Sequence, residues 1–401
     1  MKIASIYNFT AFPPKGGNHL HAVQLIRQFQ AAGHEVLTLG DPSVPGVHYF
    51  QRDVMGVREI NAQSDVLYVR IDGNHIRNDP LLIRLLQTTT KPCVWEINSP
   101  ADETLAYSYL GGASIPNNIF ARITDRAKRE SHAWRKRPGI RQEDELRKQL
   151  AARAYAATCV SSQLARYAQV ALRMKRTYVV PNGADPETHH PDGPIAEIPS
   201  RFASHLKVLF AGSPIYPWQG VQLLLQTMEL CKNAGDKICF IMLLNQPPLS
   251  PLAFDNVFVL LEVPHDAVAG YLRAADAAIV VQPDLFWSEW GTHFSPMKLF
   301  DYMACGTPVI GSRMGQVSQV IQDGRNGFLF QNTPEELRMC LLRALEKKND
   351  LRAMGKVARK DVEHTYNWKH VAARTLHILE DAVREKSPAS SATTLETSKD
   401  D

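Results

Sequence analysis

A chain of 401 residues is long enough for two or three domains, each with its own hydrophobic core. Its 44% hydrophobic and 21% charged residues are typical of a globular protein, and no apolar run approaches the roughly eighteen residues that can cross a bilayer. The N-terminus has no signal-peptide pattern, and the six cysteines include no C-x-x-C pair, which favours reduced thiols over disulfides or a metal site. We therefore expect a cytoplasmic protein and exclude integral membrane and disulfide-stapled classes.

The first half of the chain alternates apolar runs with helical patterns, which predicts a parallel sheet with helices on both faces. A helix at about residues 18–32 joins the first two strands, because Leu20, Val23, Ile26 and Phe29 recur at helical spacing. The expected strands are Lys2–Tyr7, Glu35–Leu39, Val66–Arg70, Cys93–Ile97, Thr158–Val160 and Thr177–Val180.

The most strongly charged segment runs from Arg122 to Arg153. Eleven basic residues outnumber five acidic ones there, which gives the segment a net charge of +6 against +4 for the whole chain. This segment is either a solvated helical face or a patch that attracts anionic lipid head groups or an anionic acceptor. Its aromatic residues are not interleaved with the basic ones as a base-stacking surface requires, so we expect no nucleic-acid partner.

A second alternating block follows the proline-rich passage Pro186–Pro199 and predicts a second parallel-sheet domain. Its expected strands are Lys207–Ala211, Ile238–Leu243, Val257–Leu261, Ala277–Val281, Pro308–Gly311 and Phe328–Phe330. Its expected helices lie near Val221–Asn233, His265–Ala274, Pro296–Ala304, Gln316–Gln322 and Glu335–Lys347. Two more amphipathic segments extend to about Arg384, and the Ser/Thr/Ala-rich end beyond them cannot bury a core.

The segment 295–312, which reads SPMKLFDYMACGTPVIGS, carries the clearest chemical signal. Ser295 is a suitable N-cap and Pro296 suits the first turn of a helix, so helical N–H groups should open toward the preceding loop. Such a helix start attracts phosphate, and Lys298 adds a positive charge in the first turn. Asp301 lies on the same side of the helix and can accept hydrogen bonds from ribose or sugar hydroxyls. This combination indicates a sugar-nucleotide pocket.

Four segments, in order along residues 1–375, resemble the motifs of one enzyme family. The first is Gly16-Gly17 together with the G-H-E-V run at Gly33, and the second is the V-V-P-N-G-A-D-P run that begins at Val179. The third is the 295–312 segment, and the fourth is the Q-D-G-R-N-G-F-L-F run that begins at Gln322. Together they resemble the GT4 family of retaining glycosyltransferases, which have the GT-B fold.

The resemblance implies an α/β protein with the GT-B fold, in which two Rossmann-like parallel-sheet domains face an interdomain cleft. It implies an N-terminal acceptor-side domain at residues 1–190, a linker at 191–204, and a donor domain at 205–366 that binds the nucleotide sugar. A C-terminal helix at 367–384 would cross back to pack on the first domain, followed by a disordered tail at 385–401.

The implied activity is transfer of a sugar from a nucleotide-diphosphate sugar to an acceptor hydroxyl, with retention at the anomeric carbon, in polysaccharide or glycoconjugate biosynthesis. The acceptor would be a glycan, a lipid-linked molecule or a small molecule. Contact of residues 122–153 with the inner face of a membrane would suit a lipid-linked acceptor. Two alternatives remain: an inactive GT-B homologue that binds nucleotide or glycan as a partner protein, and another GT-B enzyme such as a sugar-nucleotide epimerase or a glycoside phosphorylase.

In the first domain, Gly16 and Gly17 resemble the family loop that approaches the donor diphosphate and the acceptor. Glycines there let backbone N–H groups approach an anion without interference from a Cβ atom. His19 and His21 follow at a spacing of two residues, which does not place them on one helical face, so a shared metal site is not expected. One of the two histidines is expected to line the cleft.

Glu96 and Asn98 end an expected strand where many relatives present a histidine near the reacting carbon of the sugar. The resemblance therefore marks these two residues as candidates for catalysis. Polar residues at the carboxyl end of a strand in an α/β sheet are often functional. The alternative is a cap for the following helix, which Ser99 could supply alone.

In the second domain, relatives carry an arginine and a lysine that hold the donor diphosphate. Ser213 and Gln219 stand at these positions, and two neutral groups replace charge-assisted bonds that are roughly twice as strong. Lys298 is the expected compensating cation and a candidate for catalysis, with Arg273 and Arg313 in reserve. The change leaves open whether catalysis is reduced or abolished.

The E-x7-E motif of the family is altered as well. Its second member falls on Asp301, and its first falls on His293, with Glu289 as a nearby carboxylate that could serve instead. Ser295 and Met297, at the start of the expected helix, complete the expected donor-binding set. The two tryptophans beside Glu289 are equally suited to carbohydrate stacking and to a hydrophobic plug.

The chain has no D-x-D motif at a strand end, so we expect no metal site and no cofactor apart from the nucleotide-sugar substrate. A helix dipole together with Lys298 could neutralise a diphosphate without a divalent ion. The base and sugar of the donor, the acceptor and the oligomeric state are not given by these patterns.

Overall fold

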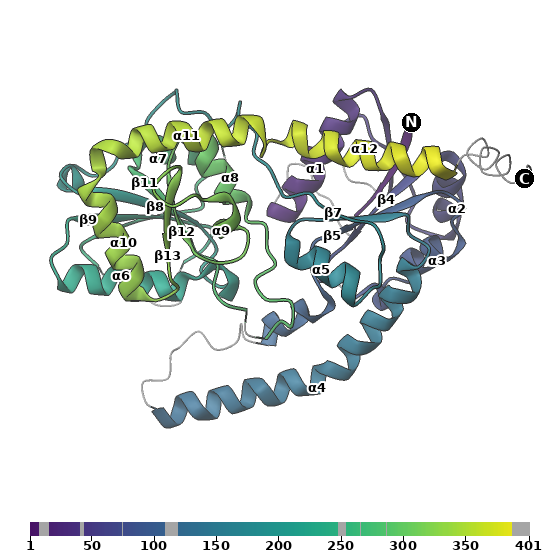
Figure 1. Ribbon diagram of the computed structural model, residues 1–401, viewed down its shortest axis with the longest axis horizontal. Coiled ribbons are helices and arrows are strands. Elements are labelled where there is room, and N and C mark those ends of the chain that lie inside the picture. The colour runs from purple at the N-terminus through teal and green to yellow at the C-terminus, as the bar shows by residue number, and fades with distance from the viewer. Residues whose placement is uncertain are drawn as a thin grey trace, which may run out of the picture. The chain divides into compact units, whose positions relative to one another are not determined.

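The computed structural model describes residues 1–7, 16–40, 44–73, 75–108, 119–247, 254–264, 266–285 and 287–386 (Figure 1). The chain divides into two compact units. Unit 1 comprises residues 1–101, 137–181 and 368 onward, and unit 2 comprises 102–136 and 182–367. The tail expected to be disordered lies outside the described residues except for its first two positions, which are helical.

Unit 1 is built on a parallel sheet that, within the described residues, has seven strands in the order β3-β2-β1-β4-β5-β6-β7. The strands are β1 (Lys2–Ile6), β2 (Glu35–Leu39), β3 (His48–Phe50), β4 (Val66–Ile71), β5 (Cys93–Ile97), β6 (Ala156–Cys159) and β7 (Thr177–Val179). The continuous burial of β4 and β5 explains their unbroken apolar sequences, since both faces of a parallel sheet are covered. The strand order reverses beside β1, which is where α/β sheets bind ligands at their carboxyl ends.

Several helices of unit 1 begin directly after a residue whose side chain caps them. They are α1 (Gly17–Ala31), α2 (Val54–Gln63), α3 (Pro80–Thr88), α5 (Ser162–Val170) and α12 (Trp368–Lys386). Asp79 accepts a hydrogen bond from the Leu82 N–H at 3.0 Å, directly before Pro80 in the first turn of α3. Ser161 caps α5 in the same way.

The C-terminal helix α12 packs on unit 1, against α1 and the central strands β4, β5 and β6 (Figure 1). Trp368, at its start, is buried and meets the His21 ring edge-on at 5.3 Å between ring centroids. The prediction that the last helix returns to the first domain is therefore confirmed, and the helix extends two residues beyond the expected end at 384.

The basic segment forms one long helix, α4 (Ile119–Ala151), which is shared between the two units. Its charged residues do not all face solvent. Arg147 and Glu143 are fully buried and pair at 2.9 Å between Nε and Oε1. Arg147 donates to the carbonyl oxygens of Asp72 at 2.7 Å and Ser99 at 3.2 Å, so α4 ties together the loops that follow β4 and β5. For this part of the segment, neither a solvated face nor a lipid-binding patch is correct.

Unit 2 has a second parallel sheet, with six strands among the described residues in the order β10-β9-β8-β11-β12-β13. These are β8 (Leu206–Gly212), β9 (Ile238–Leu244), β10 (Val257–Leu261), β11 (Ala277–Val280), β12 (Val309–Ser312) and β13 (Gly327–Phe330). Its helices are α6 (Val221–Asn233), α7 (Val268–Ala274), α8 (Met297–Ala304), α9 (Val317–Val320), α10 (Pro334–Glu346) and α11 (Leu351–His364).

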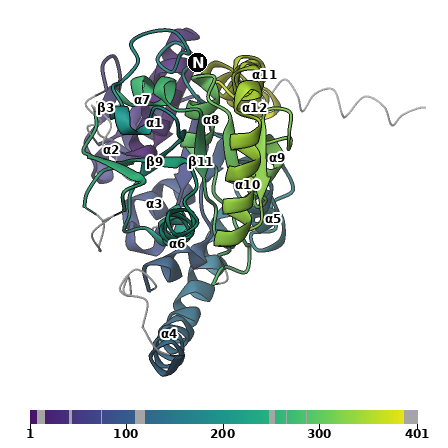
Figure 2. The same ribbon diagram turned by 90° about the vertical axis from the view of Figure 1, so that its left-hand side faces the viewer.

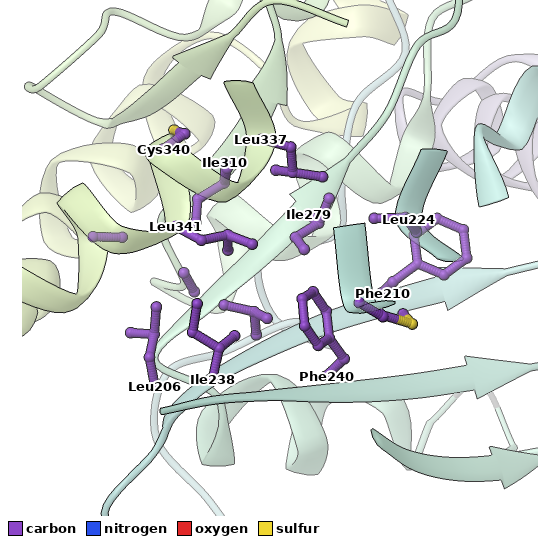
Figure 3. Packing of buried hydrophobic residues seen from close by; sticks show 14 of the residues in the cluster. Leu206, Phe210, Leu224, Ile238, Phe240, Ile279, Ile310, Leu337, Cys340 and Leu341 are labelled. Carbon is purple, nitrogen blue, oxygen red and sulfur yellow. The ribbon is translucent and has the colours of Figure 1, made fainter. Parts of the chain in front are cut away.

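Alternate strand residues of unit 2 point to opposite faces of the sheet and build two cores. One core packs α6 and α10 against the sheet, with Phe210 and Phe240 among its largest side chains (Figures 2 and 3). The opposite core contains side chains of α7, α8, α9 and α11. Helix α8 is held firmly because Leu299, Phe300, Tyr302 and Met303 are buried in this second core.

Much of the stretch expected as a linker is part of unit 2. Arg273 donates to the carbonyl oxygen of Pro194 at 2.8 Å, and Ala196 donates to that of Gly270 at 3.0 Å. Phe202, in a short 3₁₀ turn, is buried in the core that also holds α8. Proline-rich composition signals the absence of regular structure here, but not the absence of packing.

Candidate functional site

The start of α8 is fixed by a contact that the sequence pattern does not reveal. Ser295 was expected to cap the helix, but Pro296 occupies the N-cap position and no side chain caps α8. The Ser295 hydroxyl instead accepts a hydrogen bond from the Asn182 N–H at 3.0 Å, and the Asn182 amide donates to the Ser295 carbonyl at 2.7 Å. These two bonds join the second and third family-like segments, although 113 positions separate the residues in sequence.

Lys298 lies in the first turn of α8 and is partly buried. Its ammonium group donates to Oε1 of Gln219 and lies 4.2 Å from the centroid of the Phe210 ring. Burial disfavours the charged form and lowers the pKa of Lys298 to about 7. The amine is therefore poised to gain a proton when an anion approaches.

Gly212, the last residue of β8, makes room for this pair. A Cβ atom at this position would lie 2.7 Å from Gln219 Oε1 and 2.9 Å from Lys298 Nζ. The next residue, Ser213, is buried, and its hydroxyl lies 3.5 Å from the Gln246 side-chain nitrogen. The end of β8 is further fixed by the Ala211 N–H, which donates to the Tyr302 hydroxyl of α8 at 2.9 Å.

The two arginines expected as reserve cations have other roles. Arg273 donates to the carbonyl oxygens of His190 at 2.9 Å and Pro194 at 2.8 Å, so it holds the chain that enters unit 2. Arg313 pairs with Asp323 at 3.6 Å near the surface. Of the three cations that the sequence offered, Lys298 is the one that contacts a predicted donor-binding residue, Gln219.

The loop before α8 contains His293, which is fully buried. Its Nδ1 lies 3.0 Å from the Gly291 carbonyl oxygen, and burial lowers the pKa of His293 to about 4, so the ring is neutral at physiological pH. The Glu289 side chain is exposed, while its backbone N–H donates to Asp102 at 2.9 Å. Asp102 also accepts from the Ser288 hydroxyl at 3.2 Å and thereby fixes this loop.

Asp301 lies one turn after Lys298 and remains partly exposed. One of its carboxylate oxygens is 3.7 Å from Nδ1 of the buried His189. Arg359 donates to the carbonyl oxygens of Pro186 and His189 and to that of Ala304, the last residue of α8, so it ties the chain around Pro186 to the end of this helix.

Unit 1 carries a separate cluster at the carboxyl ends of β4 and β5. Glu96 is 2% exposed, and its carboxylate lies 2.9 Å from His21 Nε2 and 3.3 Å from Arg70 Nη1. It also accepts a hydrogen bond from the Asn98 amide. Burial alone would raise the pKa of Glu96, but His21, Arg70 and the hydrogen bonds outweigh it and lower the pKa to about 2.

This cluster continues to the start of α1. Arg70 donates to Oδ1 of Asn18 at 3.2 Å, directly after Gly16 and Gly17. A Cβ atom at Gly16 would meet nothing within 4 Å, so packing inside the described chain does not require glycine there. Arg70 therefore links the Glu96 carboxylate at the carboxyl end of β5 to Asn18 at the N-terminus of α1.

Comparison with known proteins bears first on unit 2. Residues 205–347 match the family model described as glycosyl transferases group 1. This segment is therefore similar to group 1 glycosyltransferases. It contains Ser213, Gln219, His293, Lys298 and Asp301.

The chain is also similar to curated glycosyltransferases. It is 23% identical to an uncharacterized glycosyltransferase of Methanocaldococcus jannaschii over 200 residues, and this alignment covers 48% of this chain and 49% of that protein. It is 27% identical over 228 residues to the MMP alpha-(1->4)-mannosyltransferase of Mycolicibacterium hassiacum, which covers 53% of this chain and 50% of that protein. The chain thus spans about half the length of these curated relatives.

Solved structures resemble nearly the whole chain. Sucrose-phosphate synthase from Thermosynechococcus elongatus superposes with a TM-score of 0.64 at 16% identity, covering 95% of this chain and 98% of that one. HepE from Anabaena, in complex with UDP, gives a TM-score of 0.64 at 15% identity and covers 95% and 100%. The fold is GT-B, and the resemblance to GT-B glycosyltransferases drawn from the four motifs is confirmed.

The structure brings together some of the residues expected at the site. Lys298 contacts Gln219 beside Gly212, and Ser295 positions the start of α8. In unit 1, Glu96 contacts Asn98. Unit 2 and unit 1 thus each carry one group of candidate residues, whose roles in binding or catalysis stay predictions.

Three residues of these groups were missed or left unassigned from sequence. Arg70 reads as the last residue of a strand, and its charge at the end of the buried run VLYVR was the available signal. Asn182 belongs to a segment noted only for its resemblance. The sequence around Asp102 shows no feature that distinguishes this residue from an aspartate that caps a helix.

Proposed function

We propose that this chain is a glycosyltransferase that moves a sugar from a nucleoside-diphosphate sugar to an acceptor hydroxyl, with retention at the anomeric carbon. The observation that carries this proposal is the start of α8, where the Lys298 amine lies beside Gln219 and Gly212 in the segment that is similar to group 1 glycosyltransferases. A helix start and a cation together suit a phosphate group.

The diphosphate would bind against the first turn of α8, where the N–H groups of Met297 and Lys298 lie at the positive end of the helix dipole. A bound anion favours the ammonium form of Lys298, so the amine takes up a proton on binding. This positive charge then stabilises the negative charge that develops on the departing phosphate. Asp301, one turn later, would accept hydrogen bonds from the ribose hydroxyls.

In the retaining reaction, the bond between the anomeric carbon and the phosphate oxygen breaks while a bond to the acceptor oxygen forms on the same face. The proton of the acceptor hydroxyl goes to the departing phosphate oxygen, and the products are the glycoside and the nucleoside diphosphate. Lys298 contributes to both steps because it lowers the charge of the departing phosphate while leaving an oxygen able to accept the proton.

The proposal includes a mechanism that does not depend on a metal. No group of three or more His, Cys, Asp or Glu side chains that could hold a metal ion occurs among the residues that the structure describes. Transfer in the presence of EDTA at the same rate as without it would support a metal-independent mechanism. Loss of transfer in EDTA that Mg²⁺ or Mn²⁺ restores would overturn it.

An inactive nucleotide-binding protein is the alternative, because Ser213 and Gln219 replace the two cations that relatives use. The single amine of Lys298, hydrogen-bonded to neutral Gln219, gives less stabilisation to a leaving diphosphate than two fixed charges. Such a protein would bind UDP or another nucleoside diphosphate but would release no sugar from any donor.

We further propose that α4 contacts the inner face of a membrane in a cytoplasmic protein. None of the helices in the described ranges is long and apolar enough to span a membrane. On α4, however, Trp134 is 73% exposed, and Arg135, Arg137 and Arg141 are exposed as well. Exposed aromatic and basic side chains on one helix suit anionic lipid head groups.

A flotation assay that compares vesicles rich in anionic lipid with neutral vesicles tests this contact. Wild-type protein should float with the anionic vesicles at low salt, and Trp134→Ala should float less. Equal flotation with neutral vesicles, or none at low salt, would leave α4 as a solvated helix.

The activity itself is tested by a thermal-shift screen against UDP-, GDP-, ADP- and dTDP-glucose, followed by detection of released sugar. HepE from Anabaena has a crystal structure in complex with UDP-glucose, so UDP-glucose is the first donor to test. A ligand at one hundred times its Kd stabilises a protein by about 2.7 kcal/mol. Stabilisation together with turnover supports the transferase, stabilisation without turnover supports the binding protein, and no stabilisation by any donor contradicts both.

A further inference from the structure

The Glu96 carboxylate is too deeply buried to touch a substrate. The side chain is 2% exposed, and its neighbours include the His21 ring at 2.9 Å, the Arg70 guanidinium at 3.3 Å and the Asn98 amide. The hydroxyl groups of the buried Tyr7 and Tyr68 face the carboxylate as well. Asn98, two residues later, is partly exposed at the end of β5. If this edge of unit 1 binds a ligand, Asn98 can reach it, whereas Glu96 acts through its neighbours.

The charges around Glu96 keep it ionised. Arg70 is a permanent cation, and Arg70 and His21 together hold the pKa of the carboxyl group well below physiological pH. An ionised carboxylate only accepts hydrogen bonds, so the group that it meets must donate. The end of the Asn98 side chain that faces Glu96 is therefore the NH₂ group.

This constraint sets the direction of the whole amide. Asn98 can present either an NH₂ donor or a carbonyl acceptor in a given direction, and the two arrangements differ by a rotation of the amide plane. Because Nδ2 is engaged by Glu96, Oδ1 points the other way. The backbone of Asn98 is held as well, since its N–H donates to the Ile71 carbonyl at 2.9 Å.

We propose that Glu96 is a positioning residue whose carboxylate orients the Asn98 amide, so that Asn98 Oδ1 accepts a hydrogen bond from a hydroxyl of the sugar substrates. The inference rests on the proposed function. It replaces a catalytic role for Glu96 with a contact made by Asn98, and it names the chemistry of that contact: a hydroxyl donor. The hydroxyl belongs either to the transferred sugar or to the acceptor.

The amide direction can be read without any substrate. In a neutron structure of the deuterium-exchanged protein, the two deuterons on Asn98 should lie on the atom that faces Glu96, and Glu96 should carry no deuteron. A deuteron on Glu96 with Asn98 Oδ1 facing it would overturn the proposal. This result holds whether or not the chain transfers a sugar, so it is separate from the proposed function.

The functional consequence is tested by exchanging the two groups. In Glu96→Gln, the new amide no longer dictates the direction of Asn98, and kcat for UDP-glucose turnover should fall about fivefold to tenfold, the worth of one hydrogen bond. In the double variant Glu96→Gln/Asn98→Asp, the amide introduced at position 96 donates to the carboxylate introduced at position 98, whose other oxygen is again an acceptor. A carboxylate stays in the cluster, so the double variant should recover most of the lost kcat.

A purely structural role would give a different pattern. Asp236→Asn also removes a carboxylate from an arginine pair, the one with Arg338 at 2.7 Å, but in unit 2, where Asp236 lies between α6 and β9. It should lower the melting temperature and leave kcat unchanged. If the Glu96→Gln loss in kcat is not recovered by the double variant although both variants are folded, the orientation role is wrong.

The source of the hydroxyl is identified by comparing two reactions of the same variants. A contact with the transferred sugar would affect hydrolysis of UDP-glucose by water and transfer to an added acceptor equally. A contact with the acceptor would slow transfer alone. A wild-type chain that releases no sugar from any of the four donors would contradict the proposed function, and the neutron result would still decide the direction of the Asn98 amide.

Discussion

The two units handle buried charge in opposite ways. In unit 1, the Glu96 carboxylate is enclosed by Arg70 and His21, and its pKa is lowered to about 2. In unit 2, the Lys298 amine contacts the neutral Gln219 and the Phe210 ring, and its pKa is lowered to about 7. One cluster therefore holds its full charge before any ligand arrives, whereas the Lys298 amine is only about half protonated at pH 7 and would become fully charged if an anion bound beside it.

This difference follows from what surrounds each group. A buried ion with an opposite charge at hydrogen-bond distance is stabilised in its charged form, whereas burial without a counter-charge favours the neutral form. The fixed cluster suits orienting a neutral hydroxyl, because its geometry does not depend on the ligand. The lysine suits a diphosphate, because the ligand supplies the missing negative charge.

The largest expected effect comes from removing Arg70. Arg70→Leu leaves the Glu96 carboxylate buried without its permanent counter-charge, which should destabilise the protein by about 3–5 kcal/mol. Lys2→Met, which removes an exposed pair with Glu35 in the same unit, should cost less than about 1 kcal/mol. Urea denaturation measures both variants, and equal losses would show that the Glu96 cluster is not a compensated buried network.

Lys298 should behave in the opposite way. Its folded-state pKa of about 7 lies below the ordinary value of 10.5, so the folded chain binds this proton less tightly than the unfolded chain. The destabilising contribution of Lys298 is therefore fully present below about pH 7, and it disappears as the pH rises to about 10.5. Lys298→Met should therefore stabilise the ligand-free protein at pH 7 and leave it unchanged near pH 10.5. Destabilisation at pH 7 would mean that a counter-charge holds the amine in its charged form.

Lys298 should favour the UDP-bound protein, although it destabilises the ligand-free protein. Lys298→Ala should weaken UDP binding by about 1.5–3 kcal/mol, the range for a hydrogen bond to a charged group. Arg313→Ala is the matched control, because Arg313 pairs with Asp323 and not with the residues around Gln219. Calorimetry that finds equal affinities for wild type and Lys298→Ala would place the phosphate elsewhere.

A second cation should bring unit 2 closer to the family pattern that it resembles. Gln219→Lys places another ammonium next to Lys298, which should strengthen UDP binding by about 1 kcal/mol at low salt and increase its salt dependence. The same change should destabilise the ligand-free protein through like-charge repulsion. Unchanged affinity together with unchanged salt dependence would separate position 219 from the diphosphate.

The smallest effect is expected at Asp301. Asp301→Asn keeps the shape of the side chain but removes its charge. If the carboxylate accepts hydrogen bonds from the ribose hydroxyls, kcat/KM should fall by an amount that corresponds to about 0.5–1.5 kcal/mol of lost transition-state stabilisation. Asp301→Glu should be tolerated, because the E-x7-E motif that this segment resembles has glutamate at the matching position. If Asp301→Asn transfers sugar as fast as wild type, Asp301 is structural, and its contact with His189 is the role that remains.

The sequence predicted the strands well because parallel strands are buried on both faces and stand out as apolar runs. It missed β3, which has three residues, two of them exposed. The start of α8 was predicted to within one residue, but the N-cap was wrong, because Ser295 bonds Asn182 from a distant segment. Such a tertiary hydrogen bond leaves no trace in local spacing.

The candidate site was predictable only where chemistry and local structure coincide. Lys298 was recognisable because a cation in the first turn of a helix is itself a signal for phosphate. The burial of Glu96 by Arg70 and His21 depends on three elements that meet only in the fold, α1, β4 and β5. The same holds for α4, where Arg147 counts as one of many basic residues until the packing shows that it is buried.

Proton uptake on ligand binding tests the contrast between the units most directly. Calorimetric titration of UDP-glucose at pH 8, in two buffers of different ionisation enthalpy, measures the protons taken up for each ligand bound. Lys298 is then mostly neutral in the free protein, so wild type should take up close to one proton and Lys298→Ala none. Tight binding of UDP-glucose by wild type without proton uptake would contradict the account of a lysine that is charged by its ligand.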